Sequence, residues 1–156
     1  MDITQKGLTG EFYVLAQLTS RGFNASLTLG NTKGVDILVM NDNNNIGYKV
    51  EVKTSAKKRG PKAKRPLSWI LSKKNETNFS DNLIYCFVQL FDSDTMPKFF
   101  LVHSKVVSDF ITNDHQSWLD RPGAKGNKHN DSSMRKFKID LDDPHGYENN
   151  WELLDV

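Results

Sequence analysis

Two apolar runs that carry charged residues constrain the fold of this chain more than any other feature of its sequence. The runs cover residues 34–40 and 46–54, and the polar segment NDNNN separates them. Their β-branched residues favour strands, whereas asparagine and aspartate favour turns, so the pattern predicts a β-hairpin. If the loop has four residues, 42–45, Asp36 lies directly opposite Glu51, and the apolar residues of both strands share the other face.

Lys53 is predicted to point the same way as Glu51, because side chains two positions apart in a strand share a face. Two opposed carboxylates with β-carbons about 4.5–5.5 Å apart repel each other unless a cation lies between them. Mg²⁺ suits such a pair, Mn²⁺ is expected to substitute, and the backbone carbonyl of Val52 is a further candidate ligand. Lys53 would then assist an attacking water molecule or stabilise charge on a phosphate. The alternative is a structural ion-pair cluster of Asp36, Glu51 and Lys53 that fixes the hairpin register.

A basic segment follows the hairpin. Residues 53–74 contain nine lysines and arginines and no acidic residue, although the net charge of the whole chain is only +2. Such a local excess indicates a surface that binds a polyanion, and contacts of this kind with phosphates weaken as salt increases. The candidate nucleic-acid-binding residues are Lys57, Lys58, Arg59, Lys62, Lys64, Arg65, Lys73 and Lys74. A solvated loop is the alternative, but the segment starts where the hairpin ends, and this position favours phosphate contact.

The remaining pattern predicts further helices and strands in a mixed α/β order. We expect helices over 9–21, 68–79 and 104–111, the last capped by Ser104, and strands over 23–29, 83–91 and 98–103. Beyond Asp120 the pattern is typical of a loop, and the tail returns to the core at Trp151, Leu153 and Leu154. The length of 156 residues and the absence of a linker predict one domain over 1–156, with a core over about 6–111 and a C-terminal extension over 112–156.

Other sequence features argue against a membrane protein, a secreted protein and a zinc protein. No apolar run approaches the roughly 20 residues that span a bilayer. The N-terminus lacks the basic and apolar regions of a signal sequence, so a cytoplasmic location with no membrane partner is expected. The single cysteine, Cys86, cannot form an internal disulfide. The four histidines lack zinc-site spacing, and the sequence contains no glycine-rich phosphate loop or nucleophile elbow.

The order of these motifs resembles that of the PD-(D/E)xK nuclease superfamily, which includes restriction endonucleases and archaeal-type Holliday junction resolvases. The shared features are Gly10-Glu11 in the first helix, Gly34-Val35-Asp36-Ile37, and Val50-Glu51-Val52-Lys53-Thr54. Val35 occupies the position of the proline that names the motif, a position at which the superfamily varies. The resemblance covers residues 6–55 well, covers 56–103 only through the expected elements, and does not extend beyond them.

This resemblance implies a restriction-endonuclease-like α/β fold, in which a mixed sheet of about five strands is flanked by helices in an αβββαβ core. It implies that Asp36 and Glu51 bind the metal and that Lys53 is the catalytic lysine. Glu11 would be the additional acid that many members place near the metal, although a glutamate on an amphipathic helix is more often a solvated residue.

The function predicted on these grounds is that of a Mg²⁺-dependent endonuclease that hydrolyses phosphodiester bonds, with DNA as the expected substrate. The alternative is a non-catalytic nucleic-acid-binding subunit of a processing or defence complex. A homodimer or a partner protein is compatible with both interpretations.

Overall fold

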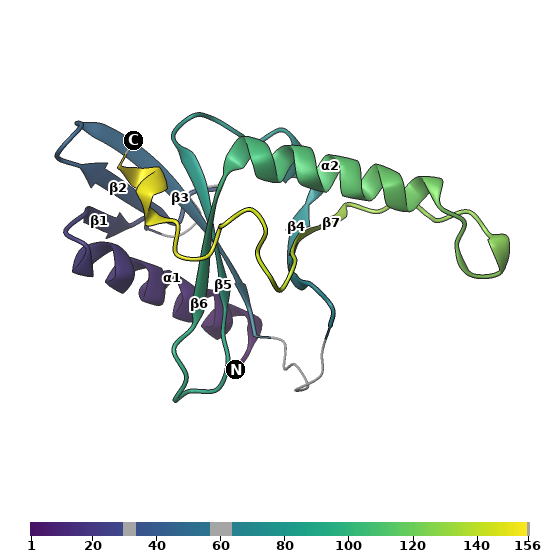
Figure 1. Ribbon diagram of the computed structural model, residues 1–156, viewed down its shortest axis with the longest axis horizontal. Helices are drawn as coiled ribbons and strands as arrows, with labels where there is room; N and C mark the ends of the chain where they lie inside the picture. The colour runs from purple at the N-terminus through teal and green to yellow at the C-terminus, as the bar shows by residue number, and fades with distance from the viewer. Residues whose placement is uncertain (30–33, 57–63, 156) are drawn as a thin grey trace.

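The computed structural model describes residues 1–29, 34–56 and 64–155 (Figure 1). Its central element is a five-stranded sheet with the order β1-β2-β3-β5-β6. The strands are β1 (Asn24–Leu27), β2 (Ile37–Asn41), β3 (Ile46–Ser55), β5 (Leu83–Gln89) and β6 (Lys98–His103). The sheet is mixed, because β3 and β5 are parallel whereas the other neighbouring pairs are antiparallel.

Other elements cover both faces of this sheet (Figure 1). One face is covered by α1 (Ile3–Ser20) and the 3₁₀ turn η3 (Trp151–Leu154). The other face is covered by α2 (Ser104–Asp120) and a two-stranded antiparallel sheet of β4 (Leu67–Ser72) and β7 (Met134–Ile139). Two further 3₁₀ turns are η1 (Lys73–Glu76) and η2 (Ala124–Gly126). The predicted mixed α/β fold, with a five-stranded mixed sheet flanked by helices, is confirmed.

The strand β5 lies between two hydrophobic cores, and all seven of its residues are buried. Its residues Ile84 and Cys86 join the core under α1, whereas Tyr85 and Phe87 join the core under α2, β4 and β7. This arrangement explains why the strand is so apolar, since a central strand covered on both faces has no solvent-facing side chains. The neighbouring strand β3 is divided in the same way, since Val50 and Val52 belong to the core under α1 and its alternate residues point to the other face.

The helix predicted over 68–79 is wrong. The chain there forms the strand β4 and then the short turn η1. In β4, Trp69 and Leu71 are buried while Ile70 is exposed, which is the two-residue period of a strand. β4 pairs along its whole length with β7, a segment predicted as loop. The two errors have one cause, since each strand forms only because the distant other one is present.

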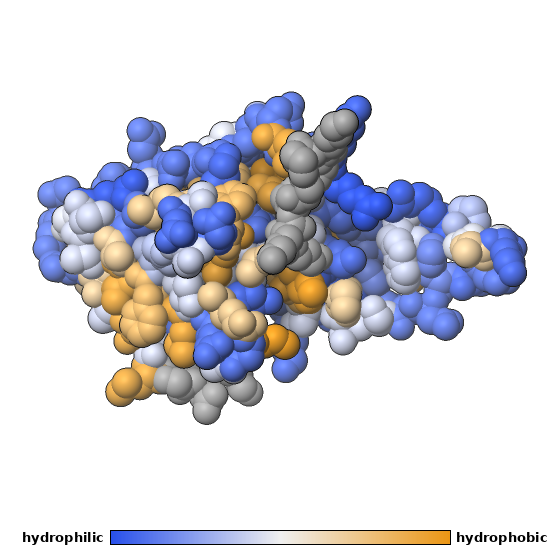
Figure 2. All heavy atoms as spheres, turned by 90° about the horizontal axis from the view of Figure 1, so that it is seen from below, coloured by the Kyte–Doolittle hydropathy of each residue, from blue (hydrophilic) through white to orange (hydrophobic). Residues whose placement is uncertain are grey.

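The two α-helices are longer than predicted. α1 begins at Ile3 rather than Thr9, because Asp2 and Gln5 form a capping box at its start. α2 continues to Asp120, well beyond Ile111, but its buried residues all lie in its first half. Its end and the following loop form an arm that Figure 2 shows to be largely hydrophilic. Ser104 does not cap α2; its hydroxyl donates to the Ser80 carbonyl.

Within the described residues, no helix is both long and apolar enough to cross a bilayer.

Candidate functional site

The hairpin of β2 and β3 brings the two acids together. Its strands pair with Ile37 opposite Val50, and one step further along the same register Asp36 lies opposite Glu51. The Asp36 N–H donates to the Val50 carbonyl over 2.9 Å, and the Val52 N–H donates to Asp36 Oδ2 over 2.7 Å. The predicted register is confirmed, and the Asp36 carboxylate is fixed against the backbone of β3.

Glu51 is the most buried acid in this region. Its side chain is only 5% exposed, and its Oε1 lies 2.6 Å from Lys53 Nζ, whose side chain is 30% exposed. Its other oxygen, Oε2, is buried, and no described residue donates a hydrogen bond of good geometry to it. The Tyr85 hydroxyl lies near the same carboxylate, and this proximity contributes to the raised pKa of Tyr85. An unsatisfied buried carboxylate oxygen is costly, so this atom marks a position where a donor or a cation would be stabilised.

Glu11 joins the cluster from the helix α1. Burial raises the pKa of the Glu11 carboxyl, and the negative charge of Asp36 raises it further, whereas Lys53 acts in the opposite direction. Glu11 therefore lies close enough to Asp36 and Lys53 for their charges to change its pKa. The structure therefore brings together the four residues that the sequence singled out, which are Glu11, Asp36, Glu51 and Lys53.

Gly10 allows this approach of α1 to β3. A β-carbon at Gly10 would lie 1.9 Å from Thr54 Oγ1 and 3.0 Å from Thr54 Cβ. A hydroxyl can rotate away, but the Thr54 Cβ is fixed by the strand. The glycine therefore sets the distance between the helix that carries Glu11 and the strand that carries Glu51 and Lys53.

Gly10→Ala is expected to lower the free energy of unfolding. Forcing an extra methyl group into a packed contact costs about 1–3 kcal/mol, which exceeds the gain in helix propensity of about 1 kcal/mol. Gly7→Ala is the matched control, because a β-carbon at Gly7 meets no atom within 4 Å, and this change should stabilise the protein slightly. Urea unfolding measures both. Equal stabilisation by the two changes would show that α1 does not depend on close contact with Thr54.

Three polar residues at the site were not predicted as part of it. Tyr85 lies beside Glu51 in the parallel pairing of β3 with β5. Burial and the charge of Glu51 raise the pKa of the Tyr85 hydroxyl, which accepts a hydrogen bond of 2.8 Å from Asn75 Nδ2. A β-carbon at Gly34 would lie 2.9 Å from Asn78 Nδ2 and 3.6 Å from Glu51 Oε2.

The sequence offered little signal for these three residues. Tyr85 lies in the most apolar run of the chain, where a tyrosine is usually a core residue. Asn75 lies in η1 and Asn78 lies just after it, both in the segment predicted as a helix. Gly34 has a positive φ of 73° and no room for a side chain, so it admits only glycine beside Glu51.

The candidate basic residues divide into two groups. Lys57, Lys58, Arg59 and Lys62 lie outside the described residues. Lys64 and Arg65 are exposed at the start of β4, and Lys73 and Lys74 are exposed in η1 at its end. η1 also contains Asn75, which contacts Tyr85, so Lys73 and Lys74 lie on the element that reaches the acidic cluster.

The donors at the cluster fit a hard divalent cation. Asp36 and Glu51 supply carboxylate oxygens, and Glu51 Oε2 accepts no hydrogen bond of good geometry from a described residue. Mg²⁺ is held in many proteins by one or two carboxylates with several water molecules. Among the described residues no group of three or more histidine, cysteine, aspartate and glutamate side chains is close enough to enclose a metal. The arrangement therefore suits a cation that keeps much of its water, not one enclosed by protein.

Burial raises the pKa of the Asp36 carboxyl above its ordinary value of 3.8. The charge of Glu51 acts in the same direction, whereas the hydrogen bond from Val52 and the charge of Lys53 oppose it. A carboxyl whose pKa is raised by folding contributes stability that is fully present below the unfolded pKa and is lost as the pH rises through the folded pKa. Ionised Asp36 therefore destabilises the metal-free protein at neutral pH.

Asp36→Asn is expected to increase the stability of the metal-free protein at neutral pH, and the increase should disappear as the pH falls below about 4. Urea unfolding in EDTA across this range measures the effect. Asp92→Asn is the control of opposite sign, because hydrogen bonds from Thr95 and the backbone lower the pKa of Asp92. That change should decrease stability at neutral pH. A stability difference for Asp36→Asn that does not vary with pH would contradict the assigned cause.

Comparison with known proteins places the chain by its fold. No family model and no curated protein matches the sequence. Among solved structures, the chain is similar to a bacterial homing endonuclease, I-Ssp6803I, with a TM-score of 0.57 and 14% sequence identity. The match covers 99% of this chain and 95% of that chain. The chain therefore has a fold that is found in a nuclease, and it has this fold over its whole length.

Proposed function

We propose that this protein is a metal-dependent endonuclease that hydrolyses phosphodiester bonds of DNA. The observation that carries the proposal is the unpartnered buried Oε2 of Glu51, which lies with Asp36 and Lys53 at one end of the hairpin. A fold shared with a homing endonuclease supports the same function. The PD-(D/E)xK assignment of these residues is part of the proposal.

Asp36, Glu51 and the Val52 carbonyl would hold Mg²⁺, with Mn²⁺ as a substitute. When bound, the ion supplies a Lewis acid that polarises the phosphate and lowers the pKa of a coordinated water molecule. Lys53 is the cationic side chain of the cluster, and its partial exposure lets it meet a phosphate oxygen and stabilise developing charge. Burial and the charge of Asp36 raise the pKa of the Glu11 carboxyl, so this group holds a proton more readily than a solvated glutamate does.

Tyr85, Asn75 and Asn78 are positioning residues in this scheme. The hydrogen bond from Asn75 to the Tyr85 hydroxyl links η1 to the strand beside β3. This link restricts the orientation of the Tyr85 ring next to Glu51. Because the reacting groups must be held within a fraction of an ångström, such supporting contacts determine how well the carboxylates are aligned.

The proposed substrate follows from charge. The exposed basic residues lie on both sides of β4, and they would contact phosphates on either side of the cleaved bond. They are Lys64 and Arg65 before β4, and Lys73 and Lys74 in η1 after it. Lys57, Lys58, Arg59 and Lys62 are proposed to extend this surface. Binding that depends on several such contacts should weaken steeply with salt.

The test is a cleavage assay on plasmid DNA with Mg²⁺, Mn²⁺ or EDTA, with Asp36→Asn as the inactive variant. We expect cutting with either metal, and none in EDTA or with the variant. Thermal unfolding gives a second measurement, since a ligand that binds only the folded state raises its stability. Mn²⁺ should raise the melting temperature of the original protein but not that of Asp36→Asn.

The two measurements also separate the alternative function. No cutting and no stabilisation by metal, with salt-sensitive DNA binding retained, would overturn the proposal in favour of a non-catalytic binding subunit. Cutting that is equal in the original protein and in Asp36→Asn would assign the activity to other residues or to a contaminant.

A further inference from the structure

The small sheet of β4 and β7 has one buried face and one exposed face. Its inner face packs Trp69 and Phe137 against the main sheet, with Trp69 Nε1 donating to the Val88 carbonyl over 2.9 Å. Its outer face is formed by the alternate residues, in the opposed pairs Ser68 and Lys138, Ile70 and Lys136, and Ser72 and Met134. Figure 1 shows this ribbon beside α2, away from the helix α1.

The outer face carries apolar and basic side chains together. Ile70, within β4, is 57% exposed, and Met134, the first residue of β7, is 49% exposed. Lys136 lies between them and forms no ion pair with a described residue. The face contains no acidic residue. It therefore combines positive charge, short hydroxyl side chains and apolar side chains on two adjacent strands.

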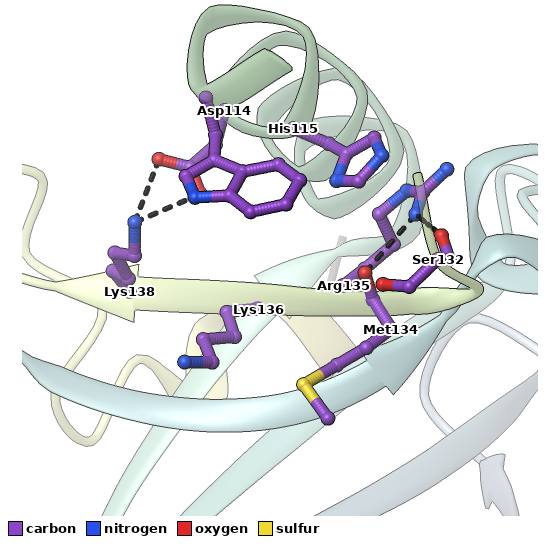
Figure 3. Close-up of a pocket in the computed structure, with 8 residues that line it drawn as sticks. Asp114, His115, Ser132, Met134, Arg135, Lys136 and Lys138 are labelled. Atoms are coloured by element: carbon purple, nitrogen blue, oxygen red, sulfur yellow. Dashed lines mark hydrogen bonds and ion pairs between the residues drawn. The ribbon is translucent and has the colours of Figure 1, made fainter. Parts of the chain in front are cut away.

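An ion pair links the ribbon to α2 at its edge. Lys138 Nζ lies 2.8 Å from each carboxylate oxygen of Asp114 on α2. Figure 3 shows Asp114 and His115 on the helix above the strand, with Lys136 on β7 extending away from this ion pair. The ion pair neutralises Asp114, and Lys136 has no ion-pair partner among the described residues. Because rigid elements present side chains more accurately than loops do, this anchoring suits a surface that recognises a partner.

We propose that the outer face of the β4–β7 ribbon enters the major groove of duplex DNA and contacts base edges. This inference rests on the proposed function, and it names the form of the substrate and the element that selects it. The groups on the face match those that bases display in this groove. Lysine donates to guanine O6 and N7, serine bonds to any base pair, and apolar side chains contact the thymine methyl group.

Duplex DNA fits this surface better than RNA does. The major groove of B-form DNA is about 12 Å wide and admits a two-stranded β-ribbon. The major groove of A-form RNA is deep and narrow, and side chains cannot read it. Single strands are bound mainly by stacking on exposed aromatic rings. The outer face of the ribbon has no aromatic residue, and Trp118 of α2, which lies beside Met134 and Lys136, is half-buried and already stacked on His115 and His129.

The position of the ribbon is compatible with cleavage. Its strand β4 ends at Ser72, and the chain then reaches Asn78, which lies beside Gly34 and near Glu51. Six residues of chain span at most about 20 Å. Phosphates border the major groove on both sides, and cleavage requires that one of them lie beyond Ser72, toward the acidic cluster.

The experiment uses the complete protein in EDTA and selects duplexes from a randomised DNA pool. Binding of the selected sequence is then measured for Lys136→Ala and Ile70→Ala. Lys98→Ala is the control, because Lys98 is 48% exposed, lies on the edge strand β6 of the other sheet and pairs with Glu148 instead of a ribbon residue. Each ribbon variant should bind about tenfold more weakly and should accept other bases at one or two positions. The control should bind and select as the original protein does.

The outcomes separate this inference from the proposed function. Metal-dependent cutting together with ribbon variants that bind and select normally would overturn the ribbon inference and leave the nuclease function intact. Loss of selective binding in the variants, in a protein that does not cut, would support the ribbon and overturn the nuclease. Failure to bind duplex DNA, or stronger binding to RNA duplexes or single strands of the same sequence, would overturn the ribbon inference.

Discussion

Lys53→Ala is expected to reduce the rate of metal-dependent cleavage about 10²- to 10³-fold, the usual cost of removing one charge-stabilising group from a reaction centre. Lys53 Nζ lies 2.6 Å from Glu51 Oε1 while part of the side chain remains exposed. It can therefore hold the carboxylate and meet a phosphate oxygen at once. Single-turnover cleavage of plasmid DNA at saturating Mg²⁺ measures the effect without a contribution from product release.

Lys49→Ala is the matched control for this change. Lys49 lies on the same strand and the same face as Lys53, but it is exposed at the other end of β3. The control should cut at nearly the original rate. Thermal unfolding of both variants with Mn²⁺ shows whether each one is folded and still binds the metal. A folded Lys53→Ala variant that binds Mn²⁺ and cuts at the original rate would remove the lysine from the mechanism.

Arg135→Ala is expected to lower the free energy of unfolding by about 3–5 kcal/mol, because it leaves a largely buried carboxylate without its partner. The Arg135 side chain is 3% exposed and forms a salt bridge with Glu76, which is 18% exposed. It also donates to the Ser132 carbonyl over 2.6 Å. These bonds tie β7 to η1, the element that contains Asn75. Urea unfolding measures the loss, and cleavage should fall as well.

The pair variant Arg135→Met with Glu76→Leu distinguishes a buried charge from lost packing. Replacing a buried ion pair by apolar residues of similar size is often neutral or stabilising. The double variant should therefore be clearly more stable than Arg135→Ala. If it is as unstable as the single variant, the arginine acts through its packing and its backbone hydrogen bonds, and the charge of Glu76 is not the cause.

The hairpin illustrates how far local pattern alone can predict this protein. The polar loop fixed the turn, and the alternation of apolar residues fixed which face of each strand is buried. Because a shift by one residue would expose Ile37 and Val50, only one register is compatible with the sequence. The opposition of Asp36 and Glu51, and the position of Lys53 beside them, follow directly from that register.

The β4–β7 ribbon shows where local pattern fails. In isolation the segment LSWILSKKNE is compatible with a short helix, because its alternation lasts for only six residues. β7 has three charged residues, Arg135, Lys136 and Lys138, and Arg135 shares the buried face with Phe137 and Ile139, so this face does not look apolar in the sequence. Each strand is stabilised by a partner more than sixty residues away, and the sequence of a short segment does not show that such a partner exists.

The sequence by itself determined the hairpin, its register and the three charged residues at its end, because these depend on the two-residue period of a strand and on a short turn. The tertiary structure decided the rest of the site. It brought Glu11 close through the contact of Gly10 with Thr54, and it placed Tyr85 beside Glu51 by a parallel pairing. It also brought Asn75 and Asn78 to the site from the segment that follows β4. Those contacts join residues that are distant in the chain, and their free energy comes from cores that form only when the whole molecule has folded.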